Sequence, residues 1–253
     1  MKVVIIGSGN VATHLAKALL KADVEIAQIW SNTYKNAVEL ADLVGAKAIK
    51  QLSDINQTAD FCLIAVKDDS ILSVVAQLKG FKGTIAHTSG AVNLNIFERL
   101  VENYGVFYPL QTFSKSKEGI FSNIPICVEG NHLIALTNLM LLASKLSQNV
   151  KEIDSEKRKI LHLSAVFACN FTNHLYALAQ EILASQQLDF ELLRPLISET
   201  ASKVQLALPL QVQTGPAIRN DQETLKKHEE LLSKQPDLLN IYKTLSDSIK
   251  KTR

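Results

Sequence analysis

The sequence has 253 residues, of which 47% are apolar and 21% are charged, a composition typical of a globular protein with a substantial core. Lysine and arginine exceed aspartate and glutamate by only two (27 against 25), and there is no long basic run, which argues against a nucleic-acid-binding surface. No stretch reaches the roughly 18 consecutive apolar residues of a membrane helix, and the first apolar run ends at Gly7, too early for a signal peptide. We therefore expect a cytoplasmic protein with a small, weakly charged partner.

The three cysteines, Cys62, Cys127 and Cys169, are odd in number, far apart and each set among apolar residues. This pattern argues against a disulfide framework and against a zinc site. We predict that all three are reduced core residues, and we expect no metal.

Short apolar runs alternate with helical patterns over the first 150 residues, which predicts an α/β fold with a doubly wound parallel sheet. Two of the runs, "VVII" and "FCLIAV", are apolar throughout, as strands covered on both faces are. The predicted strands are 3–6, 25–30, 46–49, 61–66, 84–87, 106–108 and 124–128. Helices are predicted to begin near Asn10, Tyr34, Asp69 and Asn93, and another covers 131–148.

The pattern changes after Asp154, beyond which no strand is predicted. From Ser155, "SEKRKILHLSAVFACNFTNHLYALAQEIL" carries apolar residues at helical spacing for about eight turns, which predicts one long, largely buried helix. We therefore predict two domains, an α/β domain over 1–152 and an all-helical domain over 153–253.

Capping and breaking residues predict where the other helices of the second domain lie. Ser155 is the expected N-cap of the long helix, and Asp189 is the expected N-cap of the next, in which Pro195 makes a kink or a break. Asn220 offers a capping-box start for a charged helix, and a last helix follows Pro236.

A glycine turn follows the first strand and opens the first helix. The residues from Gly7 to Ala12 fit the pattern G-x-G-x-x-A, and the second strand of the unit ends about 20 residues later. Gly7 permits the tight turn, Gly9 lets the backbone approach a pyrophosphate, and Ala12 allows close helix packing. The residues predicted to bind the phosphates of a dinucleotide at the helix start are Gly7, Ser8, Gly9, Asn10 and Val11.

The end of the second strand predicts which dinucleotide is bound. An acidic residue there would hold the ribose 2′-hydroxyl of NAD, but the sequence reads "QIWSNTYKN". Ser31, Asn32 and Thr33 offer uncharged donors, and Lys35 offers a cation, a set that suits a 2′-phosphate. We predict NADP over NAD; the alternative for Lys35 is a solvated lysine at a helix start.

The other strand ends carry the remaining candidate residues, because ligands of doubly wound sheets lie beyond the carboxyl ends of the strands. After the fourth strand, Ala65, Val66 and Lys67 are predicted to contact the cofactor. After the fifth, "HTSGAV" concentrates polar groups, with His87 as a candidate catalytic residue or a structural histidine. Ser89 and Gly90 are candidate substrate-binding residues there. "YPLQTFS", which ends the sixth strand, reads as the rim of a loop.

Polar residues interrupt the long helix at His162, Asn170, Asn173 and His174. At 100° per residue, His162 and Asn173 fall within about 40° of one another, whereas Asn170 and His174 point elsewhere. Such a set forms either a hydrogen-bond network between helices or a ligand site facing the first domain, and we favour the ligand site. His162 and Asn170 are then candidate catalytic residues, and Asn173 is a candidate substrate contact.

Arg219 lies just beyond the Gly215-Pro216 turn. It is a candidate to bind a substrate carboxylate or phosphate, and a salt bridge with Asp221 is the alternative.

Several of these stretches carry a resemblance. "GSGNVATHLAKAL", "HTSGAV", "YPLQTFS", "LHLSAVFACNFTNHLYALA" and "QTGPAIRND" together resemble bacterial Rossmann-like proteins with a helical C-terminal domain of unknown function, often labelled candidate NADP oxidoreductases. The similarity covers nearly the whole chain. The N-terminal half is also similar to pyrroline-5-carboxylate reductase, in which "GxGNMA" and "AVKP" stand at 7–12 and 65–68. Asp68 replaces that proline here.

The two-domain plan resembles, more distantly, the β-hydroxyacid dehydrogenases and ketopantoate reductase, whose interdomain helix carries a catalytic lysine and an asparagine. Asn170 matches the asparagine, but Val166 stands where the lysine would be, which argues against the lysine mechanism. The resemblance implies a homodimer formed through the helical domains and an active site between those domains and the cofactor.

Three functions are compatible with these residues. The first is an oxidoreductase that moves hydride between NADPH and a small C=O or C=N substrate in the interdomain cleft, with His87 or His162 as proton donor and Asn170 and Ser89 orienting the substrate. The second is a sensor or scaffold that binds NADP(H) without turnover, which the missing lysine favours. The third is reduction with a deazaflavin cofactor.

Overall fold

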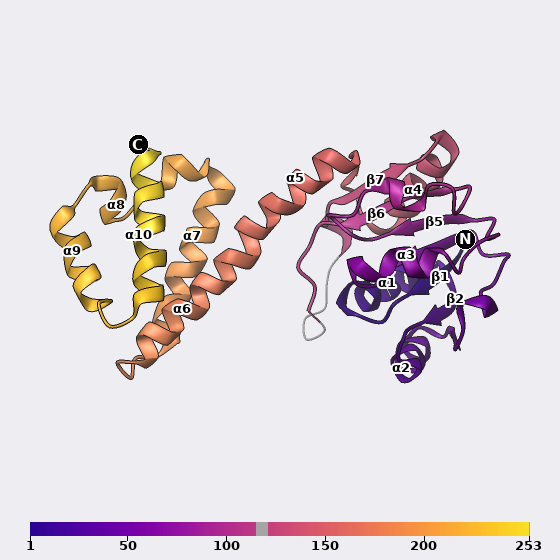
Figure 1. Cartoon of the computed structure of the whole chain (residues 1–253), viewed down its shortest axis with the longest axis horizontal. Coiled ribbons are helices and arrows are strands. Elements are labelled where there is room, and N and C mark those ends of the chain that lie inside the picture. Colours follow the sequence, from indigo (N-terminus) through magenta and orange to yellow (C-terminus); the bar gives the residue numbers. More distant parts are fainter. Residues whose placement is uncertain (115–120, 253) are drawn as a thin grey trace. The chain divides into compact units, whose positions relative to one another are not determined.

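A sheet of eight strands, counted over the residues that the computed structural model describes (1–114 and 121–252), organises the first part of the chain (Figure 1). Its strand order is β3-β2-β1-β4-β5-β6-β7-β8. The strands are β1 (Lys2–Ile6), β2 (Glu25–Trp30), β3 (Lys47–Ile49), β4 (Phe61–Ile64), β5 (Thr84–His87), β6 (Tyr104–Pro109), β7 (Ile126–Gly130) and β8 (Val150–Glu152).

The pairing is parallel from β3 through β6, as in the predicted doubly wound sheet. β7 then runs antiparallel to β6, with Cys127 opposite Tyr108, and β8 runs parallel to β7. All seven predicted strands are present, with ends that differ by up to two residues; β8 is an additional strand. The helix expected near Asn93 is a single 3-10 turn, Leu94–Phe97.

Helices cover both faces of the sheet. β1 and β4 are therefore buried along their apolar residues. One core cluster packs β1 and β2 against α1 (Asn10–Lys21), α2 (Tyr34–Val44) and α4 (Leu133–Leu146). The other packs alternate side chains of the same strands against α3 (Ile71–Val75) and Phe97.

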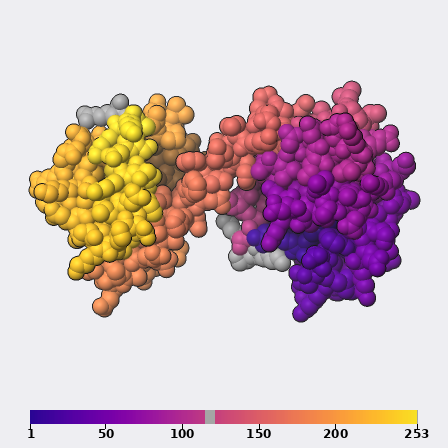
Figure 2. Space-filling view, in the orientation of Figure 1, coloured from indigo at the N-terminus to yellow at the C-terminus, as the bar shows by residue number. Residues whose placement is uncertain are grey.

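The chain divides into two compact units, Met1–Cys169 and Asn170–Arg253, shown in space-filling form in Figure 2. The predicted division at 152/153 lies just before α5 (Ser155–Ala165), whereas the division into compact units lies after α5, whose Ser155 and Arg158 contact the first unit. The second unit contains α6 (Thr172–Ala184), α7 (Arg194–Leu206), α8 (Pro216–Arg219), α9 (Gln222–Leu231) and α10 (Pro236–Lys251).

The long helix expected from Ser155 is present but is not largely buried. It is continuous through α5, a π-helical segment at Val166–Phe171, and α6. Ile160 is 64% exposed, and Leu163 and Leu175 are also exposed. The prediction failed because periodicity reports which residues share a helix face, not whether another element covers it. Cys169 is likewise exposed, whereas Cys62 and Cys127 are buried as predicted.

Helix caps differ from the predictions by one residue at two places. Asp154 caps α5 by accepting a bond from the Lys157 amide, and Asp221 caps α9 by accepting one from Thr224. Asp189 accepts from the Glu191 amide, as predicted, and Pro195 lies in the first turn of α7, where proline is tolerated.

Among the described residues, no helix is long and apolar enough to cross a membrane, and no three or more metal-ligating side chains lie together.

A buried arginine fastens α5 to the sheet. The Arg158 side chain is completely buried, and its guanidinium donates to the Glu129 carboxylate at the end of β7 and to the Val92 carbonyl. The Ser155 hydroxyl donates to the same carboxylate at 2.8 Å and accepts the Leu94 amide at 2.9 Å. The start of α5 is therefore bound to both β7 and the 92–94 segment.

Removing the arginine should destabilise the first unit strongly, because Glu129 would keep its charge in a mostly buried place. We expect Arg158→Met to lower the free energy of unfolding by about 3–5 kcal/mol. Urea unfolding followed by the fluorescence of Trp30, the single tryptophan, measures this in the first unit. Lys159→Met, which breaks the exposed Lys159–Glu156 pair of the same helix, is the control and should cost less than about 1 kcal/mol. Equal losses in the two variants would contradict the assignment.

Candidate functional site

A cavity of about 1060 Å³ lies in the first unit along the carboxyl ends of the parallel strands. This is the edge at which doubly wound sheets bind their ligands. The residues that line it are 7–11, 30–32, 65–68, 70, 73, 74, 77, 88–90, 108, 109, 111 and 162. These include ten of the twelve residues predicted to bind the cofactor, as well as Ser89, Gly90 and His162.

The glycine turn after β1 forms one end of the cavity. Gly7 has a φ of 127° and donates its amide to the Trp30 carbonyl at 2.7 Å, and a Cβ on it would lie 2.1 Å from the Ala65 carbonyl oxygen. A Cβ on Gly9 would meet no atom within 4 Å, so the backbone there stands open to the cavity. Within the part of the chain that the structure describes, no side chain caps the start of α1. Its first amides can therefore bind a pyrophosphate.

The end of β2 supplies the groups expected to discriminate between dinucleotides. The Ser31 hydroxyl lies 2.8 Å from that of Ser8, and both Ser31 and Asn32 line the cavity. Among the described residues, no carboxylate lines this end. Thr33 and Lys35 are not part of the lining; the Lys35 ammonium is 83% exposed and lies 4.0 Å from Glu39. Lys35 is thus exposed at the start of α2, as the alternative of a solvated lysine expects, and its contact with a 2′-phosphate stays a prediction.

His87 lies beneath the cavity rather than in it. Its side chain is fully buried, its ring stacks on Phe97, and its Nδ1 accepts the Ser89 amide at 3.2 Å. Burial, and after it the nearby charge of Arg158, lower the pKa of His87 to about 3. A neutral, enclosed imidazole of this kind suits the structural alternative and does not suit a proton donor at neutral pH.

Ser89 closes the turn that follows β5. Its hydroxyl accepts the amides of Ala91 and Val92, both at 3.1 Å, while the residue still lines the cavity. The Ser89 hydroxyl, which was predicted to orient a substrate, thus stabilises the backbone turn that contains Gly90.

Tyr108 and His162 meet at the other end of the cavity. The Tyr108 Oη lies 3.1 Å from the His162 Nδ1, and the two rings are arranged edge to face. A Cβ on Gly90 would lie 2.7 Å from that Nδ1 and 2.8 Å from the Tyr108 Cζ. Gly90 therefore makes room for the two rings, a role different from the predicted substrate contact.

The Tyr108 hydroxyl keeps its proton at neutral pH. Burial raises the pKa of Tyr108 to about 12; the neighbouring Cys127 adds to the effect and Arg158 opposes it. Sequence reasoning missed Tyr108, because its partner is 54 residues away in the chain. Its place at the end of a predicted strand was the available signal.

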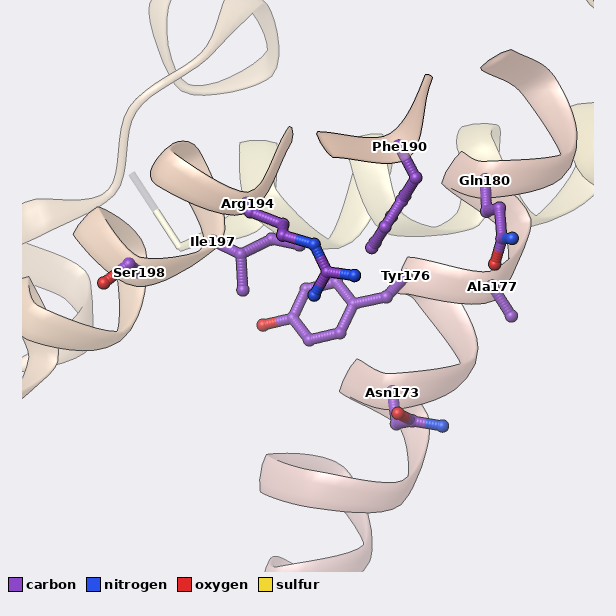
Figure 3. Close-up of a pocket in the computed structure, with 8 residues that line it drawn as sticks. All are labelled: Asn173, Tyr176, Ala177, Gln180, Phe190, Arg194, Ile197 and Ser198. Atoms are coloured by element: carbon purple, nitrogen blue, oxygen red, sulfur yellow. The ribbon is translucent and has the colours of Figure 1, made fainter. Parts of the chain in front are cut away.

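The other predicted residues belong to the second unit. Asn170 is exposed in the π-helical segment, and Arg219 is exposed at the end of α8, where its charge helps to lower the pKa of Asp221. Asn173 lines a pocket of about 510 Å³ between α6 and α7, which Tyr176 and Arg194 also line (Figure 3). The Arg194 guanidinium lies over the Phe190 ring there, 5.6 Å from its centroid. In that unit His174 lines a different pocket, so the polar residues of the helix do not form one set.

The comparisons with known proteins agree with this geometry. The crystal structure of BF3122 from Bacteroides fragilis, described as a candidate NADP oxidoreductase, is 42% identical to this chain, covers 99% of it and 98% of its own chain, and superposes with a TM-score of 0.93. The chain belongs to this family of NADP oxidoreductases. NADP, the cofactor predicted from the end of β2, is the cofactor named for the family.

Two family models also match. Residues 2–86 match a model described as NADP oxidoreductase, coenzyme F420-dependent, and residues 124–249 match a domain of unknown function, DUF2520. None of the curated proteins matches the sequence.

More distant structures share the fold of this oxidoreductase. A reductive aminase from Aspergillus terreus, in complex with NADPH and ethyl-5-oxohexanoate, superposes with a TM-score of 0.75 at 14% identity, covering 98% of this chain and 92% of its own. The pyrroline-5-carboxylate reductase of Streptococcus pyogenes does so with a TM-score of 0.68 at 14% identity, covering 99% and 98%.

The two glycines of the turn should respond differently to alanine. Gly7→Ala forces a left-handed φ and a backbone clash, and we expect it to lower the free energy of unfolding by at least about 3 kcal/mol. Gly9→Ala meets only open space and should change it by less than about 0.5 kcal/mol. Urea unfolding monitored at Trp30 tests both; equal destabilisation would contradict the described turn.

Proposed function

We propose that the protein is an NADPH-dependent reductase that transfers hydride to a small C=O or C=N substrate bound at the Tyr108–His162 end of the cavity. The observation that carries this proposal is the continuity of one cavity from the glycine turn to these two rings. A dinucleotide whose pyrophosphate lies at Gly9 extends along the strand ends toward residues 88–90.

The bound cofactor supplies the hydride, and the protein supplies position and a proton. His162 is the proton source in this proposal, because it lines the cavity, whereas His87 is enclosed beneath it. The roles predicted for Asn170, Asn173 and Arg219 as substrate contacts remain predictions.

The first test is a binding and turnover experiment. Titration with NADPH, followed by nicotinamide fluorescence, should show saturable binding that Gly9→Ala abolishes while the fold is retained, because the added methyl group occupies the phosphate cradle. NADPH oxidation is then followed at 340 nm with cyclic imines, ketones, and ketones with amines. Binding without oxidation of NADPH by any substrate would favour the sensor or scaffold. Binding of a reduced deazaflavin in place of NADPH would favour the third alternative.

Cofactor choice is testable at Asn32. Asn32→Asp places a carboxylate at the end of β2, where it repels a 2′-phosphate and accepts a bond from a 2′-hydroxyl. We expect the affinity for NADPH to fall by about 10- to 100-fold and the affinity for NADH to be unchanged or higher, about 1.4–2.7 kcal/mol of discrimination. Lys35→Ala, which changes an exposed residue outside the lining, is the control and should alter either affinity less than about threefold. Equal losses for the two nucleotides in Asn32→Asp would contradict the assignment.

We also infer that the helical unit associates with a second copy of the chain. Large apolar side chains of this unit are exposed in the single chain, including Leu192, Leu196, Leu206 and Leu208, with Leu206 89% exposed. Leu192, in the 3-10 turn Phe190–Leu193, and Leu196, in the first turn of α7, are four residues apart. Exposed apolar surface of this kind is typical of protein interfaces.

The dimer is testable by sedimentation. We expect the wild-type protein to sediment as a dimer at micromolar concentration and Leu196→Asp to sediment as a monomer, because a carboxylate would be buried in the interface. Leu43→Asp, on α2 of the first unit, is similarly exposed and should remain a dimer. A monomeric wild-type protein would overturn the inference.

A further inference from the structure

We propose that Tyr108 is a catalytic residue, and that Tyr108 and His162 form a proton relay in which the tyrosine hydroxyl protonates the substrate and the imidazole replaces the proton. The inference rests on the proposed reductase function and deepens it. The evidence is the geometry of the pair, its place in the cavity, and the glycine that accommodates it.

The pair is built by three separate segments. Tyr108 comes from β6, in the interior of the sheet, and His162 comes from the second turn of α5. Gly90, after β5, presents bare backbone to both rings, and any side chain there would displace one of them. Nothing in local sequence requires this meeting, so the contact depends on the tertiary fold.

The order of the relay follows from the elements that carry the two groups. β6 ends at the same edge as β5, where the strand ends line the cavity, so Tyr108 is on the side of the bound nucleotide. His162 lies on α5, outside the sheet, and its side chain is partly exposed, so its imidazole can exchange protons with solvent. A proton from water therefore reaches His162 first.

The Tyr108 hydroxyl suits the inner position. Because burial raises the pKa of Tyr108 to about 12, the phenol holds its proton until a strongly basic atom forms beside it. The substrate oxygen or nitrogen becomes such a base as the carbon of its C=O or C=N bond is reduced.

The proton balance is complete. The substrate oxygen or nitrogen takes the proton as the O–H bond of Tyr108 breaks. The phenolate oxygen then takes the proton of the His162 Nδ1–H while the Nε2 of the same ring takes a proton from solvent, so the ring is never left as an anion. Exchange with solvent then returns the ring to its Nδ1–H form. Each turnover consumes one NADPH and one proton, and both side chains return to their starting states.

Four variants test the relay. Tyr108→Phe removes only the hydroxyl, His162→Gln removes the imidazole, and the double variant removes both. Tyr104→Phe, at the other end of β6, is the matched control. NADPH affinity should stay within about threefold of wild type in all four.

Turnover should separate the variants. We expect Tyr108→Phe to lose about 10²- to 10⁴-fold in kcat, and the double variant to lose no more than about threefold beyond the worse single variant, because groups that act as a unit are not additive. Tyr104→Phe should retain wild-type kcat. A kcat in Tyr108→Phe within threefold of wild type would overturn the relay. A loss of kcat in the double variant equal to the product of the two single losses would also overturn it.

A spectroscopic measurement tests the pair without turnover. With ¹⁵N-labelled histidine, the His162 Nδ1 signal, assigned by its absence in His162→Gln, should shift in Tyr108→Phe and in Gly90→Ala but not in Tyr104→Phe. An unchanged Nδ1 signal in Tyr108→Phe would overturn the pairing. If the wild-type protein binds no NADPH, the proposed function fails; if it binds and oxidises NADPH while Tyr108→Phe does so equally well, the relay alone fails.

Discussion

The arrangement of the site depends on the buried charge of Arg158. A guanidinium that is completely removed from water requires ionic and hydrogen-bonding partners, and here they come from β7, from the 92–94 segment and from its own helix. Because these partners lie in different elements, satisfying the one charge fixes α5, the sheet edge and the turn after β5 together. His162 follows Arg158 by one helical turn, so its position against Tyr108 is set by the same contacts.

Burial also distinguishes the two histidines of the first unit that the sequence offered as proton donors. His87 and His162 have the same chemistry, but His87 is enclosed against Phe97 and held neutral, while His162 lines the cavity beside a hydroxyl. The distinction lies in packing, since both residues stand in polar stretches of sequence that look equally suitable for catalysis.

Features that depend on local sequence were predictable. β2 and β5 begin and end at the predicted residues because short, mostly apolar segments are bounded there by polar and turn residues. The glycine turn was predictable because Gly7 has a positive φ and lies against the Ala65 carbonyl, a position that only glycine allows. Features that depend on tertiary contacts could not be predicted from local sequence. Ser155 looked like an N-cap, but its hydroxyl is bonded to Glu129, and Gly90 looked like a substrate contact although it accommodates two rings.

The reversal of strand direction at β7 determines from which edge of the sheet α5 starts. In an all-parallel sheet every strand ends at the ligand-binding edge, and the helix that follows it runs back toward the opposite edge. β7 and β8 run the other way, so the chain leaves β8 at the edge remote from the cavity and α5 travels in the same sense as β6. The seven residues from Ser155, beside Glu129, to His162, beside Tyr108, rise by about 10 Å, which spans this path. Because β6 and β7 are antiparallel, α5, which is not a crossover helix between parallel strands, can place His162 at the carboxyl ends of the strands.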